Sequence, residues 1–488
     1  SPGSAAPARH LVVVTIDTLR ADRLGAYGNT TIPTPNLDRL AREGVRAADA
    51  TVHVPITRPS HTSLFTGRYP SEHGIRDNIA PPLAADVPTL AAILKAQGFV
   101  TAAFVSSFVL SKQSGLDRGF DHYDDAFPAA PAGETLFLDS VQRRGDDTVA
   151  HLSGWLEGRS AEAKAARTAL WVHLYDPHDP YEPPEPYASR FKDRPYDGEV
   201  AWTDEVIGRL RQTLETHGVW DDALVVVTAD HGEALGEHGE TGHGFFAYET
   251  TLHVPWIARG PRVAANQVLQ GPLRSVDLLP TVLDLLGLAA QTPSVTGHSV
   301  AAHLGPGAPA LAGSTYAESL TPLLHYQWSD LRVWREGQWK YVLAPRPELY
   351  DLKADPGETR DLSAAEPGES QGLHPRPAAD VENALVAAHR QLLQHRIAEQ
   401  LDLRAHDLLL ECEATAQPQR GTTMLLNHCH AAANISHART RPVQAAEGSY
   451  NKRVEWVIND YNNWKDGTGD GRLVRHHADN GFEDLGNR

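Results

Sequence analysis

Cysteine and methionine are scarce in this sequence: 488 residues contain two cysteines and one methionine. Both cysteines, Cys412 and Cys429, lie beyond residue 400. The preceding part of the chain therefore has no disulfide bond, no cysteine-based zinc site and no cysteine nucleophile. We expect a soluble protein, and a periplasmic location or secretion after removal of a signal segment is compatible with the sequence.

Long apolar runs and an excess of basic residues are also missing. No run approaches the roughly 20 apolar residues of a membrane-spanning helix. The chain has 44 Lys and Arg against 62 Asp and Glu, a formal charge of −18. Nucleic-acid binders normally carry a basic surface, so we expect no such partner. A small anionic or neutral ester substrate remains compatible, and the sequence leaves a homo-oligomer open.

Four short apolar segments indicate buried strands of a mostly parallel sheet. They are followed or separated by stretches with helical periodicity, such as Pro35–Gly44 and Pro88–Gly98, which begin at Pro and end at Gly. This alternation predicts an α/β fold with helices on both faces of the sheet. The four segments begin at Leu11, Phe99, Ala169 and Ala223.

Changes in composition and residue pattern divide the chain into four parts. We expect a flexible N-terminus over residues 1–9, a catalytic α/β domain over 10–305 and a smaller C-terminal α+β subdomain over 306–412. The last of these contains an alternating hairpin pattern at 330–343 and an amphipathic helical pattern at 382–396. Residues 413–488 read as a poorly ordered tail or a cloning-derived extension.

Polar side chains follow several of the predicted strands. Asp17, Ser106, Asp176 and the pair Asp230-His231 all stand at carboxyl ends, where ligands bind in open α/β sheets. Each acid could simply end its strand or cap the next helix. Two carboxylates and an imidazole at adjacent strand ends would, however, repel or remain unsatisfied unless a cation lay between them. Asp17, Asp230 and His231 with one further oxygen suit Zn²⁺, while Mn²⁺ or Ca²⁺ would also be accommodated.

Thr57 could supply that further oxygen. It lies in V-P-I-T-R-P-S-H-T-S-L-F-T-G-R, where it is expected to cap a helix that starts at Pro59-Ser60. A hydroxyl bound to a divalent cation becomes a usable nucleophile at neutral pH, and a helix N-terminus attracts anions. The pattern therefore predicts both a cap and a nucleophile, in a site that cleaves esters of an anion.

Five motifs occur in order between about residue 10 and residue 365: I-D-T-L-R-A-D-R-L-G, T-R-P-S-H-T-S-L-F-T-G-R-Y-P, D-P-H-D-P-Y, V-V-V-T-A-D-H-G-E and L-Y-D-L-K-A-D-P-G-E. Together they resemble the sulfatase family of the alkaline phosphatase superfamily. The resemblance implies a large, mixed but mostly parallel sheet flanked by helices and a small C-terminal sheet domain. It also implies a metal-dependent, often promiscuous ester hydrolase.

The resemblance assigns roles to individual residues. Asp17, Asp230 and His231 match metal ligands, and Thr57 occupies the nucleophile position. The other matched positions are catalytic His178 and His243, where His243 replaces a Lys, and substrate-contacting Asn78, which matches the phosphonate monoester hydrolase branch. His61, at the position of a motif Arg, and Ser106, at the end of its strand, are further candidate substrate contacts.

Departures from the family pattern narrow the chemistry. Sulfatases carry Cys or Ser at position 57 and oxidise it to formylglycine, which Thr cannot form. His61 replaces an Arg, Thr18 replaces a second metal-binding Asp, and the motif G-K-W-H-L-G is absent. The loss of basic side chains suits a singly charged or neutral substrate. These features favour phosphodiesters, phosphonate monoesters or phosphotriesters, cleaved through a phospho-Thr57 intermediate.

Several alternatives remain at this point. A sulfatase that works without formylglycine, a phospho-group transferase and a non-catalytic binding protein all fit the fold. One metal ion is favoured over two, because the histidines around Asp176 lack the D-x-x-x-H spacing expected of a second site.

Overall fold

The computed structural model describes residues 6–127, 142–363, 474–477 and 481–484. The chain forms two units, Ser1–Glu369 and Ser370–Arg488. Within the described residues, no helix combines the length and the apolar composition needed to cross a bilayer. The predicted amphipathic helix at 382–396 and most of the predicted tail lie outside the described residues.

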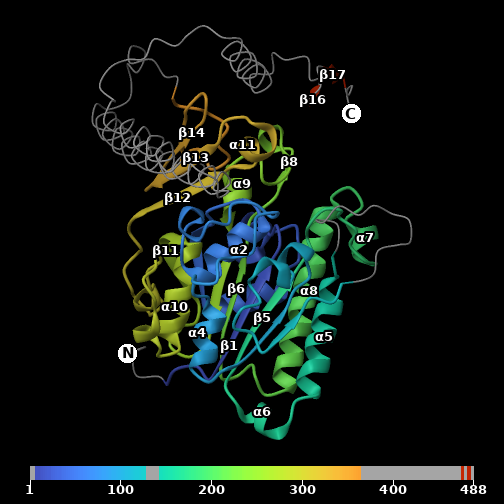
Figure 1. Ribbon diagram of the computed structural model, residues 1–488, viewed down its shortest axis with the longest axis vertical. Helices are drawn as coiled ribbons and strands as arrows, with labels where there is room; N and C mark the ends of the chain where they lie inside the picture. Colours follow the sequence, from blue (N-terminus) through green and yellow to red (C-terminus); the bar gives the residue numbers. More distant parts are fainter. Residues whose placement is uncertain (1–5, 128–141, 364–473, 478–480, 485–488) are drawn as a thin grey trace, which may run out of the picture. The chain divides into compact units, whose positions relative to one another are not determined.

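A nine-stranded sheet forms the centre of the first unit (Figure 1). Its order is β11-β2-β10-β6-β1-β5-β3-β4, with β9 paired to β2. The four predicted strands are confirmed and run parallel to one another in the middle of the sheet. β10 is antiparallel to both of its neighbours, which makes the sheet mixed. The strands are β1 (His10–Ile16), β2 (Val45–Thr51), β3 (Val100–Phe104), β4 (His122–Asp124), β5 (Thr168–Leu174), β6 (Ala223–Ala229), β9 (His253–Val254), β10 (Trp256–Arg259) and β11 (Gln267–Arg274).

Helices cover both faces of this sheet. α8 contacts α1 and α5 on one face, and α2 contacts α4 and α10 on the other. The predicted helix at 35–44 is confirmed as α1, whereas the one at 88–98 begins only at Leu90, after the capping hydroxyl of Thr89. The helices are α1 (Pro35–Glu43), α2 (Thr57–Thr66), α3 (Pro70–His73), α4 (Leu90–Ala96), α5 (Gly145–Glu157), α6 (Ala161–Ala165), α7 (Tyr187–Arg190), α8 (Pro195–Thr216), α9 (Glu249–Leu252), α10 (Leu278–Leu285) and α11 (Thr321–Tyr326).

A small antiparallel sheet follows in the same unit. It contains the predicted hairpin, β13 (Leu331–Glu336) and β14 (Trp339–Leu343), flanked by β12 (Ser314–Ser319) and β15 (Glu348–Asp351). Elsewhere, β7 (Ala234–Leu235) pairs with β8 (Thr241–Gly242), and in the second unit β16 (Val474–His477) pairs with β17 (Gly481–Asp484).

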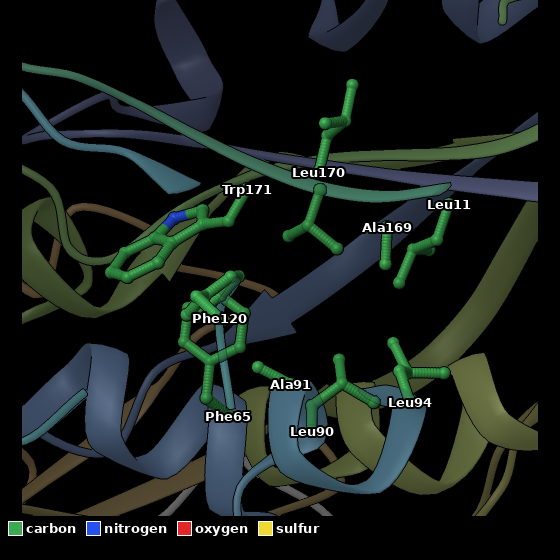
Figure 2. A pocket seen from close by; sticks show the side chains of 10 residues that line it. Leu11, Phe65, Leu90, Ala91, Leu94, Phe120, Ala169, Leu170 and Trp171 are labelled. Atoms are coloured by element: carbon green, nitrogen blue, oxygen red, sulfur yellow. The ribbon is translucent and has the colours of Figure 1, made fainter. Parts of the chain in front are cut away.

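The core between the sheet and the helices α2 and α4 is apolar and closely packed. Figure 2 shows Leu90 and Leu94 of α4 pointing toward the strands, with Phe65 and Trp171 beside them. The hollow that these side chains enclose is about 10 Å³, close to the volume of one water molecule. It is too small for an organic ligand.

Candidate active site

Two carboxylates and an imidazole follow neighbouring parallel strands. Asp17 comes directly after β1, and Asp230 and His231 come directly after β6. β1 and β6 pair in register, with Ile16 opposite Ala229, so the three side chains reach the same edge of the sheet. All three are fully buried.

These side chains converge on a common space. Nε2 of His231 lies 3.5 Å from Oδ1 of Asp17 and 3.5 Å from Oδ2 of Asp230. Both oxygens of Asp17 and Oδ2 of Asp230 are buried and have no hydrogen-bond partner among the described residues. Unpartnered buried oxygens are costly, whereas two carboxylates and an imidazole make a suitable ligand set for a divalent cation. The residues present therefore fit a metal site.

The hydrogen bonds of His231 leave the correct nitrogen available for a cation. Its Nδ1 donates to the carbonyl oxygen of Gly232 at 3.0 Å, so the lone pair is on Nε2. Burial and the nearby imidazole of His243 lower the pKa of His231 well below its ordinary value, which keeps the ring neutral. Gly232 itself permits a close backbone approach, because a Cβ there would lie 2.1 Å from the carbonyl oxygen of Thr250.

The two carboxylates differ in their pKa values. Burial opposes the charge of Asp17, yet the imidazoles of His173, His178 and His231 together hold its pKa below the ordinary value. Burial and the charge of Asp17 raise the pKa of Asp230. The two buried carboxylates thus repel each other, and a cation between them would remove that repulsion.

Thr57 is the first residue of α2 and not its cap. Ile56 holds the cap position, and no side-chain hydrogen bond caps the helix from there. The predicted capping role is therefore wrong. The hydroxyl Oγ1 of Thr57 instead lies 3.4 Å from Nε2 of His231, at the edge of the candidate metal site.

The backbone amides at the start of α2 are largely engaged. The Arg58 N–H donates to Oδ1 of Asn78 at 2.9 Å, Pro59 has no N–H, and the Ser60 N–H donates to the Ile56 carbonyl oxygen at 3.1 Å. The helix start thus contributes the positive end of its dipole and few free donors. Asn78 supports this turn through Oδ1, and its predicted contact with substrate stays a prediction.

Two more imidazoles stand beside His231. The ring centroid of His243 lies 4.3 Å from that of His231 and 4.9 Å from that of His178. Nδ1 of His243 donates to Oε1 of Glu233 at 3.0 Å. Burial opposes protonation, but the charge of Glu233 and this hydrogen bond raise the pKa of His243 to about 9. Nδ1 of His178 donates to the Asp179 carbonyl oxygen at 2.6 Å, and its Nε2 takes no part in that bond.

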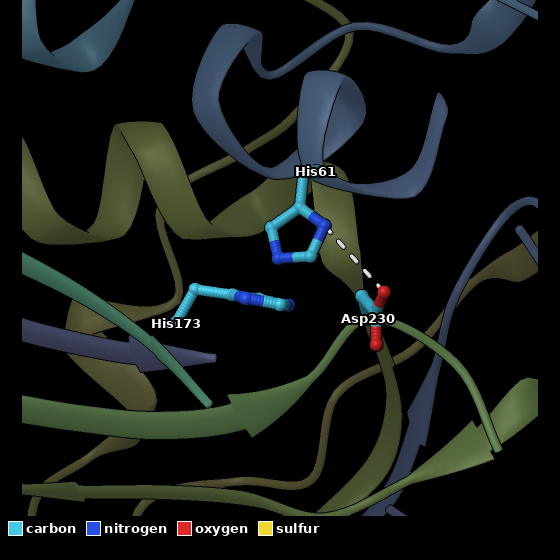
Figure 3. Close-up of side chains that lie close together, drawn as sticks. All are labelled: His61, His173 and Asp230. Carbon is cyan, nitrogen blue, oxygen red and sulfur yellow. Dashed lines mark ion pairs between the residues drawn. The ribbon is translucent and has the colours of Figure 1, made fainter. Parts of the chain in front are cut away.

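The predicted contacts His61 and Ser106 lie in a layer below these groups. Figure 3 shows His61 of α2 and His173 of β5 near Asp230, with Nδ1 of His61 3.5 Å from Oδ2 of Asp230. That Nδ1 donates to the Thr57 carbonyl oxygen at 2.7 Å, and Nε2 accepts from Thr15 Oγ1 at 2.9 Å. The Ser106 hydroxyl bonds to the His173 carbonyl oxygen and to Thr148. Both predicted side chains are fully buried and engaged by the protein.

Sequence reasoning overlooked His173 and Glu233 at this site and noted Thr18 only as the replacement of a second metal-binding Asp. His173 stands in an otherwise apolar strand, which was the available signal for it, and its Nε2 is 3.5 Å from Oδ2 of Asp17. Glu233 follows His231 by two residues and pairs with His243. Thr18 is buried at φ 54°, an uncommon conformation for a β-branched residue, and its hydroxyl has no partner among the described residues.

Comparison with known proteins identifies the family. The sequence model described as Sulfatase matches residues 9–288, more than half of the chain. The chain belongs to the sulfatase family. Members of this family are hydrolases that act on esters and depend on a divalent cation, in agreement with the ligand set at Asp17, Asp230 and His231.

The individual relatives have low sequence identity to this chain but match it over most of its length. The chain is 25% identical to a Delta 4,5-hexuronate-2-O-sulfatase of Bacteroides thetaiotaomicron, covering 82% of this chain and 92% of that protein. It is 26% identical to the choline-sulfatase of Rhizobium meliloti, covering 78% and 86%. Among solved structures, the phosphonate monoester hydrolase of Agrobacterium radiobacter matches with a TM-score of 0.63 and 23% identity, covering 80% of this chain and 96% of that one. The sulfatase fold is thereby confirmed.

Proposed function

We propose that this sulfatase-family protein hydrolyses phosphate-type esters, namely phosphodiesters, phosphonate monoesters or phosphotriesters, with Thr57 as nucleophile. The observation that carries the proposal is the residue at position 57. Its hydroxyl lies 3.4 Å from Nε2 of His231, beside the two acids, and a threonine side chain cannot be oxidised to the aldehyde of formylglycine. A sulfate ester on threonine lacks the elimination route that an aldehyde hydrate offers.

The reaction would then proceed as a double displacement. Thr57 loses its hydroxyl proton to water as Oγ1 attacks phosphorus, the bond from phosphorus to the leaving oxygen breaks, and that oxygen receives a proton from His178 or His243. Water next attacks the phospho-Thr57 ester in line, which releases the product and restores the hydroxyl. The pair formed by His243 and Glu233 keeps an N–H donor beside the ester oxygens.

One divalent cation, preferentially Zn²⁺, would be held by Asp17, Asp230 and His231, with Thr57 adjacent. When bound, it would supply positive charge that acidifies a hydroxyl and stabilises the ester oxygens. His61 and His173 are poorly suited to a second ion. Both nitrogens of His61 are used in hydrogen bonds, and Nδ1 of His173 accepts from the Ser106 N–H at 3.3 Å, which puts the proton of that ring on Nε2.

The charge around the site supports a substrate with few negative charges. A family Arg is replaced by His61, whose hydrogen bonds are those of a neutral imidazole. A dianionic monoester would lose more from this replacement than a singly charged diester or phosphonate ester.

A substrate panel tests the proposal. The full-length protein, loaded with Zn²⁺, is assayed on p-nitrophenyl esters of four kinds: sulfate, phosphate, methyl phosphate and phenylphosphonate. We expect kcat/KM on the methyl phosphate diester or the phosphonate to exceed that on the sulfate by at least about tenfold, which is about 1.4 kcal/mol of transition-state stabilisation. A preference for the sulfate would instead support a sulfatase that works without formylglycine.

A transferase is separated from a hydrolase in the same assay. A hydrolase releases the leaving alcohol and the phosphorus-containing product in equal amounts in water alone. A transferase would show release that depends on an added alcohol acceptor and a new ester of that acceptor.

A further inference from the structure

Exposed apolar side chains are concentrated on one part of the described surface. The large exposed ones are Ile79 (71%), Val268 (40%), Leu323 (41%), Leu324 (51%) and Tyr326 (53%). Four of these five lie on two short segments, at Ile79 and within or beside α11. A scattered exposed leucine is ordinary, but such a concentration indicates a binding surface.

Specific contacts hold the two segments together. His325 of α11 forms an ion pair with Asp77, two residues before Ile79. The ring of Tyr326 lies 5.5 Å from that of Phe245 and 5.4 Å from that of Trp328, measured between centroids. We call the resulting surface the apolar rim; it comprises Ile79, Phe245, Leu323, Leu324, Tyr326 and Trp328.

Residues next to the apolar rim in sequence contact the residues on either side of Thr57. Asn78, which precedes Ile79, accepts the N–H of Arg58, the residue after Thr57. Gly244, which precedes Phe245, packs close to Ile56, the residue before Thr57. A Cβ on Gly244 would lie 3.4 Å from Cγ1 of Ile56 and 3.7 Å from Oγ1 of Thr321, the first residue of α11.

The same loop connects the apolar rim with the imidazoles of the site. His243 is two residues before Phe245, and its side chain is 18% exposed, whereas Asp17, Asp230 and His231 are fully buried. The hydroxyl of Ser319 fixes this loop through bonds to the carbonyl oxygens of Gly244 and Phe245, at 2.7 and 3.0 Å. The path outward from the buried centre therefore runs from charged groups to apolar ones within a few residues.

We propose that the apolar rim binds the organic group of the ester and selects substrates whose organic group is extended and apolar. The ester's polar head would lie at Thr57 and His243, and its alkyl chain or aromatic ring system would cover Ile79, Leu324 and Tyr326. This occupant is favoured because both rim segments are anchored on the chain neighbours of the nucleophile. The proposal rests on the proposed function for the anion, and its test is independent of which anion is preferred.

The test compares esters that differ only in the organic group. The substrate panel first shows whether phosphorus or sulfur esters are hydrolysed. Within that class, kcat/KM of the full-length protein is then measured on methyl, n-octyl and naphthyl esters. We expect kcat/KM for the octyl ester to exceed that for the methyl ester, because the two leaving alcohols are similarly basic and differ in apolar surface. The variants Ile79→Ser and Leu324→Ser should each lower the octyl-to-methyl ratio by about tenfold, the scale of losing apolar contacts in a pocket. Because naphthol is a better leaving group than methanol, only the change in the naphthyl-to-methyl ratio between the wild-type protein and these variants reports binding of an aryl group.

A matched control comes from the fifth exposed apolar residue. Val268 on β11 has a similar exposure and lies outside the apolar rim, so Val268→Ser should leave the octyl-to-methyl ratio unchanged. The proposal is overturned if all three variants have the same effect, or if the ratio is unaffected by Ile79→Ser and Leu324→Ser. A change in oligomeric state or thermal stability without a change in the ratio would assign the surface to another protein segment, and would also overturn it. If the panel instead finds sulfate preferred, the anion assignment fails while the ratio test still applies.

Discussion

The hydrogen bonds of individual histidines decide what each ring contributes to the site. His231 donates through Nδ1 and leaves Nε2 for a cation. His173 does the opposite, because its Nδ1 accepts from the Ser106 N–H and its Nε2 carries the proton. That Nε2–H lies 3.5 Å from Oδ2 of Asp17, which is close enough for an electrostatic contact with the carboxylate.

Replacement of His173 therefore tests a positioning role. Loss of a group that positions a metal ligand typically weakens metal affinity by about 10–100-fold, and we expect His173→Ala to do so for Zn²⁺. The measurement is a calorimetric titration of the metal-free protein with Zn²⁺. His173→Gln, which keeps a side-chain N–H, should recover part of the affinity.

The control for this substitution is another buried histidine. His53 bonds to the carbonyl oxygen of Tyr316, away from the carboxylates, so His53→Gln should not change Zn²⁺ affinity. Unchanged affinity in His173→Ala would show that Asp17 needs no support from this ring.

At the scale of elements, α2 depends on Asn78 at its first turn. The Arg58 N–H would lose its partner in Asn78→Ala, and loss of a cap costs roughly 1 kcal/mol of unfolding free energy. Chemical denaturation of this variant and of Asn78→Asp, which keeps the accepting oxygen, measures the effect. A supporting role lowers the stability of Asn78→Ala alone, whereas a pure substrate contact would raise KM in both variants and leave stability intact.

The sequence identified the elements that carry the strongest patterns. The central strands are continuous apolar runs, so β1, β3, β5 and β6 and their parallel orientation were predictable, whereas their order in the sheet was not. β11 was not predicted, because Gly271 and Pro272 interrupt its sequence and its pairing with β2 shifts at that point. The cap at Thr57 was misplaced because Pro59 suggested the first helical position, although proline is tolerated throughout the first turn.

The candidate site was predictable where residues stand next to each other in sequence and less so where they meet only in space. Asp17, Asp230 and His231 end strands, which is a local signal. The roles of His61 and Ser106 depend on partners such as Thr15 and Thr148 that the sequence does not bring near them. Glu233 acquires its partner His243 only through the loop that contains β7 and β8.

At the scale of the whole molecule, buried charges join the two sheets of the first unit. Lys340 of β14 is fully buried and pairs with Glu249 of α9 at 2.9 Å and with Glu358 at 2.7 Å. Arg335 of β13 likewise pairs with Asp49 of β2. Glu358, in the last of the five sequence motifs, thus connects the small sheet to the catalytic part of the chain.

The buried acid Glu199 makes the stability of the molecule depend on pH. Glu199 of α8 is only 4% exposed, and burial together with the charge of Asp176 raises its pKa from 4.5 to about 9. Between those values the unfolded chain releases a proton that the folded protein keeps, so this residue lowers stability increasingly as pH rises and has no effect below the unfolded pKa.

Glu199→Gln should therefore stabilise the protein more at high pH than at low pH. We expect a gain on the order of 1–3 kcal/mol near pH 8 and little change near pH 4, measured by chemical denaturation. Glu205, a half-buried acid of the same helix, is the control, since its pKa is lowered by Tyr187 and Arg209 and Glu205→Gln should bring no such gain. Equal effects at both pH values would show that Glu199 is ionised in the folded protein.

The most direct test of the central claim is the stereochemistry of hydrolysis at phosphorus. A phosphodiester made chiral by sulfur substitution is hydrolysed in ¹⁸O-labelled water, and the configuration of the product is determined. Attack by Thr57 followed by attack by water inverts phosphorus twice, so the account predicts net retention. Net inversion would mean that water attacks the substrate directly, and Thr57 would then not be the nucleophile.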